Sequence, residues 1–378
     1  MRYAGRFLDR VDLVTGLYFF TQDIFFLARD DLRYLSRFRD YGGKQDQTTF
    51  GVFANADVDV TRKLTISVGA RYARDRKHAR VVTGVLTPAP QLCDVIAFTC
   101  SSYPFDDTET FNSFTPRFVV KYQFTSAIQA YGSYSKGFRA GGYNIRNSAA
   151  APPGPYRDEK ADSFEIGFKG SFFDNWLRMD AAAFTNLVKD AQRQNVVVLN
   201  TGSQTVLGNA GDERLKGVEG NASARLFGGF VARGFFGYTK GFYTRVTSDI
   251  NGDRIVDGRD LALKLPRLAP WTYGGGMTWD IEAGGAGRVT VQGDIAHRDA
   301  SFFDDGNTGI LPGYEDLSAS LALSPAGIPN LRLSLFGKNL LDKVSLELNQ
   351  NLSTLPTGGQ ISVLKKGRVM GVEANFRF

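Results

Sequence analysis

Gly367-Arg-Val-Met-Gly-Val-Glu-Ala-Asn-Phe-Arg-Phe378 ends the chain and carries the clearest indication of its fold class. Apolar residues at the even positions from Met370 to Phe378 alternate with polar or small residues at the odd positions. A period of two is typical of a strand with one apolar and one polar face. An aromatic residue at the end of such a strand predicts the last strand of a membrane β-barrel. The alternative is a solvated edge strand of a soluble sheet, but the pattern recurs through the chain without accompanying helices, which favours the barrel.

The same alternation appears in most of the remaining sequence. Residues 49–60 and 64–73 predict a hairpin with a tight turn at 61–63. We expect the first strand over about 6–20, a polar loop from there to Gln47, and a final loop over 342–365. In total the sequence predicts about fourteen strands, joined alternately by long loops and short turns. The predicted fold is therefore an all-β, transmembrane antiparallel β-barrel, with residues 1–378 in one barrel domain.

Composition excludes several classes of protein. Apolar residues make up 43% of the chain and charged residues 22%, and no apolar run is long enough for a transmembrane helix. The net charge is +6, but Lys and Arg are spread along the predicted strands. Nucleic-acid binding is not expected, because it needs a basic patch or stripe.

The two cysteines, Cys93 and Cys100, lie in one polar loop. In an oxidising compartment they would close a small disulfide, and in a reducing cell they would stay free thiols. The histidines, His78 and His297, lie far apart at strand ends, so their spacing assembles neither a zinc site nor a catalytic triad. We therefore expect no enzyme activity.

The polar segment over residues 249–260 has the ligand spacing of a calcium-binding loop. Positions 1, 3, 5, 7, 9 and 12 of residues 249–260 are Asp249, Asn251, Asp253, Ile255 (through its carbonyl), Asp257 and Asp260. Hard oxygen donors at this spacing suit a structural Ca²⁺ ion. Arg254 replaces the usual Gly at position 6, and Asp260 is shorter than the usual Glu. The alternative is a polar loop rich in turn-forming residues.

Four internal stretches and the terminal Phe378 occur in one order along nearly the whole chain. They are Tyr131-Gly-Ser-Tyr-Ser-Lys-Gly-Phe-Arg-Ala-Gly-Gly-Tyr-Asn144, Asp158-Glu-Lys-Ala-Asp-Ser-Phe-Glu-Ile-Gly-Phe-Lys-Gly170, Leu215-Lys-Gly-Val-Glu-Gly220 and Lys338-Asn-Leu-Leu-Asp342. Together they resemble the barrel of a TonB-dependent outer-membrane receptor.

The resemblance implies a barrel of about 22 strands that is filled by an N-terminal plug. Such a receptor imports a scarce nutrient, such as an iron–siderophore complex, a vitamin or a carbohydrate, with energy from the TonB complex. This sequence has no recognisable plug, energy-coupling motif or signal peptide, and it predicts only the last strands. We therefore expect the C-terminal part of a 22-strand barrel in the bacterial outer membrane. Its expected partners are outer-membrane lipid, a nutrient ligand and, through the missing N-terminal region only, the TonB complex.

The resemblance also suggests where a ligand would bind. Aromatic and Arg side chains on outer loops and the lumen wall make Phe138, Arg139 and Tyr143 candidates, and Phe302 and Phe303 form a second group. Each could instead be an interfacial aromatic or a solvated loop residue. Two other functions stay open: a stand-alone passive porin of about fourteen strands, and a soluble β-rich binding protein. An edge at the first strand that does not pair with the last would argue against the porin.

Overall fold

The structure is a computed structural model that describes residues 1–32, 37–82, 105–146, 153–199, 202–328, 330–351 and 359–377. Its main feature is a single sheet of fifteen strands, and every pairing is antiparallel. The strands in spatial order are β1 (Arg2–Phe7), β2 (Val11–Leu32), β3 (Arg37–Asp59), β4 (Leu64–Val82), β5 (Phe105–Thr125), β6 (Ile128–Arg139), β7 (Glu159–Phe172), β8 (Leu177–Leu199), β9 (Gly202–Arg225), β10 (Phe230–Val246), β11 (Trp271–Glu282), β12 (Arg288–Arg298), β15 (Tyr314–Ser324), β16 (Leu331–Lys338) and β19 (Val369–Phe376). The all-β prediction is confirmed.

Short elements lie between the later strands. They are α1 (Gly258–Leu261), the 3-10 helix η2 (Gly284–Ala286), and the hairpins β13 (Ser301–Phe302) with β14 (Ile310–Leu311) and β17 (Leu346–Asn351) with β18 (Gln360–Leu364). Within the described residues, no helix has the length and apolar character needed to cross a bilayer.

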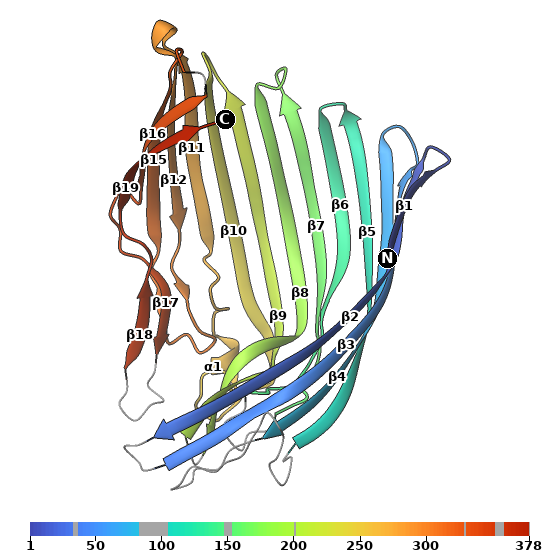
Figure 1. The fold of residues 1–378 in the computed structure, drawn as a ribbon. Helices are drawn as coiled ribbons and strands as arrows, with labels where there is room; N and C mark the ends of the chain where they lie inside the picture. Colours follow the sequence, from blue (N-terminus) through green and yellow to red (C-terminus); the bar gives the residue numbers. More distant parts are fainter. Residues whose placement is uncertain are drawn as a thin grey trace.

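The sheet curves into an open trough, with β1 at one edge and β19 at the other (Figure 1). In the described part of the chain, β1 pairs only with β2 and β19 only with β16. Long connections such as 247–270 lie at one end of the sheet, and short turns such as 173–176 lie at the other. We call these the loop end and the turn end. Because the long loops of outer-membrane barrels are extracellular, we expect the loop end to be the extracellular one.

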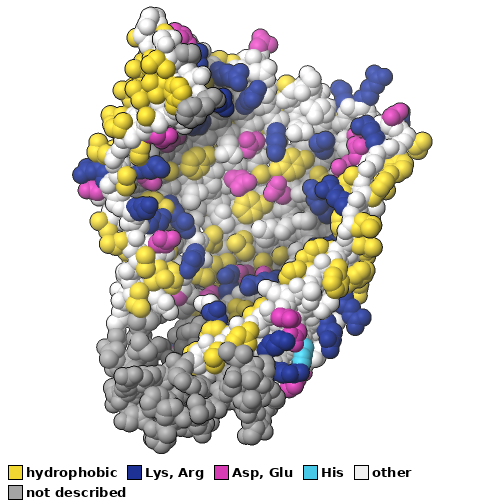
Figure 2. Space-filling model, in the orientation of Figure 1, with side chains coloured by type: hydrophobic (Ala, Val, Ile, Leu, Met, Phe, Trp, Pro, Cys, Tyr) yellow, Lys and Arg dark blue, Asp and Glu magenta, His cyan; other side chains and the backbone are white. Residues whose placement is uncertain are grey.

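The strand alternation produces two different faces. On β7, Ile166 and Phe164 point outward and are 67% and 45% exposed, while Glu165 and Lys169 point into the lumen. Figure 2 shows charged side chains of both signs on the concave face and a largely hydrophobic outer wall at the right. A continuous exposed apolar face is unfavourable in water and favourable in lipid.

The sequence misplaced the beginning of the sheet. The residues expected as one strand over 6–20 are divided between β1, a turn and β2, and Leu8 and Asp9 in that turn have positive φ values of 49° and 54°. The expected loop was wrong over residues 21–32 and 37–47, which continue β2 and β3 in register as far as the Leu32↔Arg37 pair. The sheet consequently has one strand more than the predicted fourteen or so.

A small core lies at the loop end on the lumen face of β9 and β10. Ala210, Tyr243, Ile250 and Leu265 are buried there, and partly buried Leu215, Val246, Leu263 and Leu268 pack around them. Gly241 leaves the space for this packing, because a Cβ atom at that position would meet Leu265 and Leu268. The 247–270 connection therefore folds inward against the wall.

Candidate functional site

The turn-end half of the lumen wall is hollowed. A concave space of about 820 Å³ lies along β6 to β15, over small residues such as Gly275 and Gly276. A side chain at Gly276 would meet the Asp294 carboxylate, which would have to move. Glycine at this position therefore leaves room for the Arg233–Asp294 pair in the hollow.

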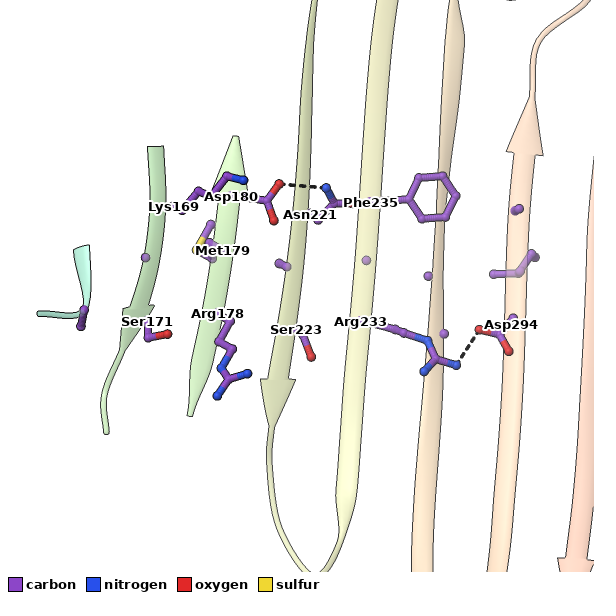
Figure 3. A pocket seen from close by; sticks show the side chains of 18 of the residues that line it. Lys169, Ser171, Arg178, Met179, Asp180, Asn221, Ser223, Arg233, Phe235 and Asp294 are labelled. Atoms are coloured by element: carbon purple, nitrogen blue, oxygen red, sulfur yellow. Dashed lines mark hydrogen bonds and ion pairs between the residues drawn. The ribbon is translucent and has the colours of Figure 1, made fainter. Parts of the chain in front are cut away.

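Charged and polar side chains of both signs line this hollow (Figure 3). Asn221 donates a hydrogen bond to Asp180 at 2.9 Å, and Arg233 forms an ion pair with Asp294 at 2.9 Å. Lys169 and Arg178 also line it, and neither has an ion-pair partner in the part of the chain that the structure describes. Such a surface suits water or a second protein surface better than a small apolar ligand.

A largely buried ionic group lies at the loop end of the lumen. Arg193 on β8 forms two hydrogen bonds to Glu213 on β9, at 2.7 and 2.6 Å, and the Glu213 side chain is only 2% exposed. Asp305, in the connection between β13 and β14, lies 3.8 Å from Arg193. Burial raises the pKa of the Asp305 carboxyl, while the Arg193 charge opposes the shift. The connection between β13 and β14 thus packs against the wall beside Arg193.

Gln192 ties a second connection to the same strands. Its side-chain amide donates to the carbonyl oxygens of Ala140 and Arg157 at 3.1 and 3.0 Å. Its main-chain N–H donates to Glu159 at 2.6 Å. Register shifts between Val188 and Gln192 turn this side chain toward the 140–158 connection. Strand alternation does not reveal this contact, because a bulge resets which face each residue occupies.

The structure separates the first group of predicted ligand residues. Phe138 follows Tyr134 and Lys136 in the outward row of β6, whereas Arg139 falls in the lumen row. Tyr143 is buried, and its hydroxyl donates to Asp107 at 2.9 Å. Burial and that hydrogen bond raise the Tyr143 pKa. These residues do not form one surface, and their contact with a ligand stays a prediction.

The second group forms a more suitable surface. The Arg267 guanidinium lies over the Phe303 ring, with Cζ 4.5 Å from the ring centroid. The main-chain N–H of Arg267 donates a hydrogen bond to the Phe302 carbonyl oxygen at 2.6 Å. Arg267 is exposed and Phe303 is half-buried, so an anionic or aromatic ligand has access to this pair. Sequence analysis missed Arg267, because it is more than thirty positions from Phe303.

The 249–260 segment folds into the tight turn that its spacing predicts. Asp249 accepts hydrogen bonds from the main-chain N–H groups of Gly252 and Arg254 at 2.7 and 2.6 Å. Asp260 is fully buried and accepts from Ile250 at 2.8 Å. These bonds satisfy the loop without a metal ion, yet a carboxylate oxygen that accepts one hydrogen bond retains a second lone pair.

Arg259 is the main electrostatic obstacle to a cation in this loop. Its guanidinium pairs with Asp253 and with Asp257, both at 2.9 Å, and lowers the pKa of the Asp257 carboxyl. The described residues contain no group of three or more His, Cys, Asp or Glu side chains placed to hold a metal ion. Calcium binding stays a prediction. The predicted Cys93–Cys100 pair lies outside the described residues.

Comparison with known proteins agrees with this geometry. The family model for the TonB dependent receptor-like β-barrel matches residues 3–340. The chain belongs to the TonB-dependent receptor β-barrel family. Members of this family are transporters of the outer membrane of Gram-negative bacteria and are not enzymes.

Solved structures of this fold cover the chain throughout. The ferric yersiniabactin uptake receptor FyuA from Yersinia pestis has a TM-score of 0.79 and 20% identity, over 100% of this chain and 53% of its own. The siderophore receptor PiuA from Acinetobacter baumannii has a TM-score of 0.74 and 17% identity, over 99% and 55%. The copper transporter OprC has a TM-score of 0.73 and 17% identity, over 100% and 57%. The chain thus spans little more than half the length of these three proteins.

Proposed function

We propose that this chain is the C-terminal wall of a longer TonB-dependent receptor that imports a metal–siderophore type of nutrient across the outer membrane. The observation that carries this proposal is the open sheet, with β1 and β19 at its two edges. In lipid, an unpaired strand edge leaves N–H and C=O groups without partners, at several kcal/mol each. Further strands of the same receptor would pair these edges and close the barrel.

The hollow at the turn end supports a plug domain in that receptor. Lys169, Arg178 and the Arg233–Asp294 pair present charges of both signs toward the lumen. A plug surface of complementary charge would cover them, and the TonB complex would act through the region that precedes the plug.

The substrate class rests on two weaker observations. FyuA is a ferric yersiniabactin uptake receptor, PiuA is a siderophore receptor, and OprC is a copper transporter. In this chain, the Arg267–Phe303 pair offers a cation on an aromatic face at the loop end. That combination suits an anionic metal chelate with planar groups, such as a ferric catecholate.

A stand-alone porin is less well supported. It would need β1 and β19 to pair and close the sheet, whereas in the described residues β1 pairs only with β2 and β19 only with β16. Passive flow also makes a different prediction from coupled transport, because it does not need the proton-motive force.

Uptake by whole cells tests the proposal. Cells that carry the gene at its native length, and a deletion strain, receive ⁵⁵Fe bound to catecholate, hydroxamate or carboxylate siderophores. We expect one class to accumulate only in the gene's presence, and a protonophore to abolish accumulation. Substituting Arg267→Ala or Phe303→Ala should weaken binding of that ligand roughly tenfold, whereas the outward-facing control Phe236→Ala should not. Accumulation of ⁵⁵Fe that is unchanged by both the deletion and the protonophore would overturn the proposal.

A further inference from the structure

Two lysines lie directly opposite each other on the outer wall. Lys216 on β9 and Lys240 on β10 are register partners, and Arg214 follows two residues from Lys216 toward the loop end. All three are exposed. Their neighbours in sequence, Leu215 and Gly241, face the loop-end core in the lumen. Because side chains alternate along a strand, the three cations point outward.

Nothing in the described chain neutralises this group. Arg214 reaches only the Thr185 hydroxyl, at 3.5 Å, and Lys216 and Lys240 have no carboxylate partner among the described residues. Asp212, two residues from Arg214 along β9, is held by Arg245 through hydrogen bonds of 2.8 and 3.0 Å. Like charges placed directly opposite destabilise a sheet unless an anion lies between them.

The depth of these cations in the membrane follows from the row beneath them. Tyr238 is two residues from Lys240, and its ring centroid lies 4.7 Å from that of Trp271. Trp271 is 44% exposed on the same outer face. Aromatic residues of this kind mark the membrane–water interface, and two residues along a strand span about 7 Å. The lysines therefore lie at the level of the lipid headgroups.

A second strand shows the same boundary. On β4, outward Tyr72 is followed by exposed Arg74 and Arg76. The transition from aromatic to cationic residues thus occurs at the loop end of two separate parts of the wall. Because we expect the loop end to be extracellular, we expect these cations to face the outer leaflet.

We propose that Arg214, Lys216 and Lys240 bind the phosphate of an anionic lipid headgroup in the outer leaflet. The two ammonium groups would hold the phosphate between them as rotatable donors, and the guanidinium would bind from the loop side. The lipid chains would lie over Val218 and Tyr238, the apolar residues directly beneath the cations. This proposal does not depend on the nutrient that the receptor carries.

Native mass spectrometry of the protein at its native length, titrated with phosphatidic acid in detergent, measures this binding. Each cation near a membrane surface contributes about fivefold in affinity. We expect the combined variant Arg214→Gln, Lys216→Gln and Lys240→Gln to weaken the tightest-bound lipid by at least roughly tenfold. If that variant does not fold, Lys240→Gln alone should weaken it by about fivefold.

The matched control removes the same charge from cations that already have carboxylate partners. Lys136 lies 3.9 Å from Asp162, Lys160 2.9 Å from Asp158, and Arg288 2.8 Å from Glu282. Changing these three cations to Gln should leave lipid affinity within twofold of the wild type, about 0.4 kcal/mol. Unchanged affinity in the first variant, or an equal loss in the control, would overturn the proposal. Displacement of the lipid by millimolar inorganic phosphate would indicate a soluble-anion site and would also overturn it.

Discussion

The two halves of the lumen wall satisfy their charged groups in different ways. At the loop end, Arg193 pairs with Glu213, whose side chain is 2% exposed, and Asp305 from the β13–β14 connection lies beside them. At the turn end, Arg178 and Lys169 face an open hollow. The side chains of Arg233 and Asp294, which form an ion pair there, are each nearly half exposed. The charged side chains of the lumen wall are therefore in contact with one of the chain's own connections at the loop end and stay uncovered at the turn end. Under the proposed function, the turn end is where a plug would contact the wall.

The largest expected effect comes from breaking the buried pair at the loop end. Glu213→Ala leaves the Arg193 charge without its main partner, which should cost about 3 kcal/mol or more. The matched change at the turn end, Asp294→Ala, removes an exposed partner from Arg233 and should cost less than about 1 kcal/mol. Urea unfolding of the receptor in detergent measures both. Equal losses would contradict the contrast between the two ends.

A similar comparison applies to the apolar core of the loop end. Leu265 is 3% exposed, and Leu265→Ala should lower the free energy of unfolding by about 2–4 kcal/mol, because it leaves a cavity against Gly241. Leu261, in the same connection, is 41% exposed, and Leu261→Ala should change stability by less than about 0.5 kcal/mol. Hydrogen exchange of residues 247–270 gives a second readout, and faster exchange is expected only in the Leu265 variant. Protection that survives this variant would show that the connection does not depend on the core.

The ionisation of Asp305 should make the docking of the β13–β14 hairpin at the loop end depend on pH. Burial raises its pKa above the ordinary value of 3.8, so the docked hairpin binds a proton more tightly than the undocked hairpin does. Docking is then strongest below pH 3.8 and weakens as pH rises through the raised pKa. A nitroxide at position 310, in a protein without Cys93 and Cys100, should become more mobile over that range. Asp305→Asn should remove the dependence, and a dependence that persists would assign it to another group.

The smallest expected effect concerns calcium. If residues 249–260 bind Ca²⁺, calorimetry at millimolar calcium should show a weak heat that Asp249→Ala abolishes. Arg259→Gln should strengthen binding, because it removes the cation that pairs with Asp253 and Asp257. Absence of a calcium-dependent heat in both the wild type and the Arg259 variant would end the hypothesis.

The sequence predicted the wall well where lipid and water lie on opposite faces. Over 64–73 the alternation is regular, and β4 forms there as expected. It failed over 21–32 and 37–47, where β2 and β3 continue past the apolar band. Beyond that band both faces of a strand meet water, so no alternation is required and the composition resembles that of a loop.

The candidate site was less predictable for a related reason. Gln192 and Arg193 come directly after register shifts in β8, and Arg267 meets Phe303 through the folding of two separate connections. Neither relation is encoded in local spacing. The 249–260 turn was predictable because its Asp and Asn side chains bind main-chain groups only a few residues away. Local hydrogen bonding thus leaves a sequence pattern, and long-range packing does not.

The most direct test of the central claim is the sequence of the genomic DNA immediately upstream of the Met1 codon. If this chain is one wall of a larger receptor, the reading frame should continue upstream and encode further barrel strands, a plug and a signal peptide. A stop codon followed directly by a promoter would contradict the account. It would leave a self-contained chain whose edges, β1 and β19, must then pair with each other or with another subunit.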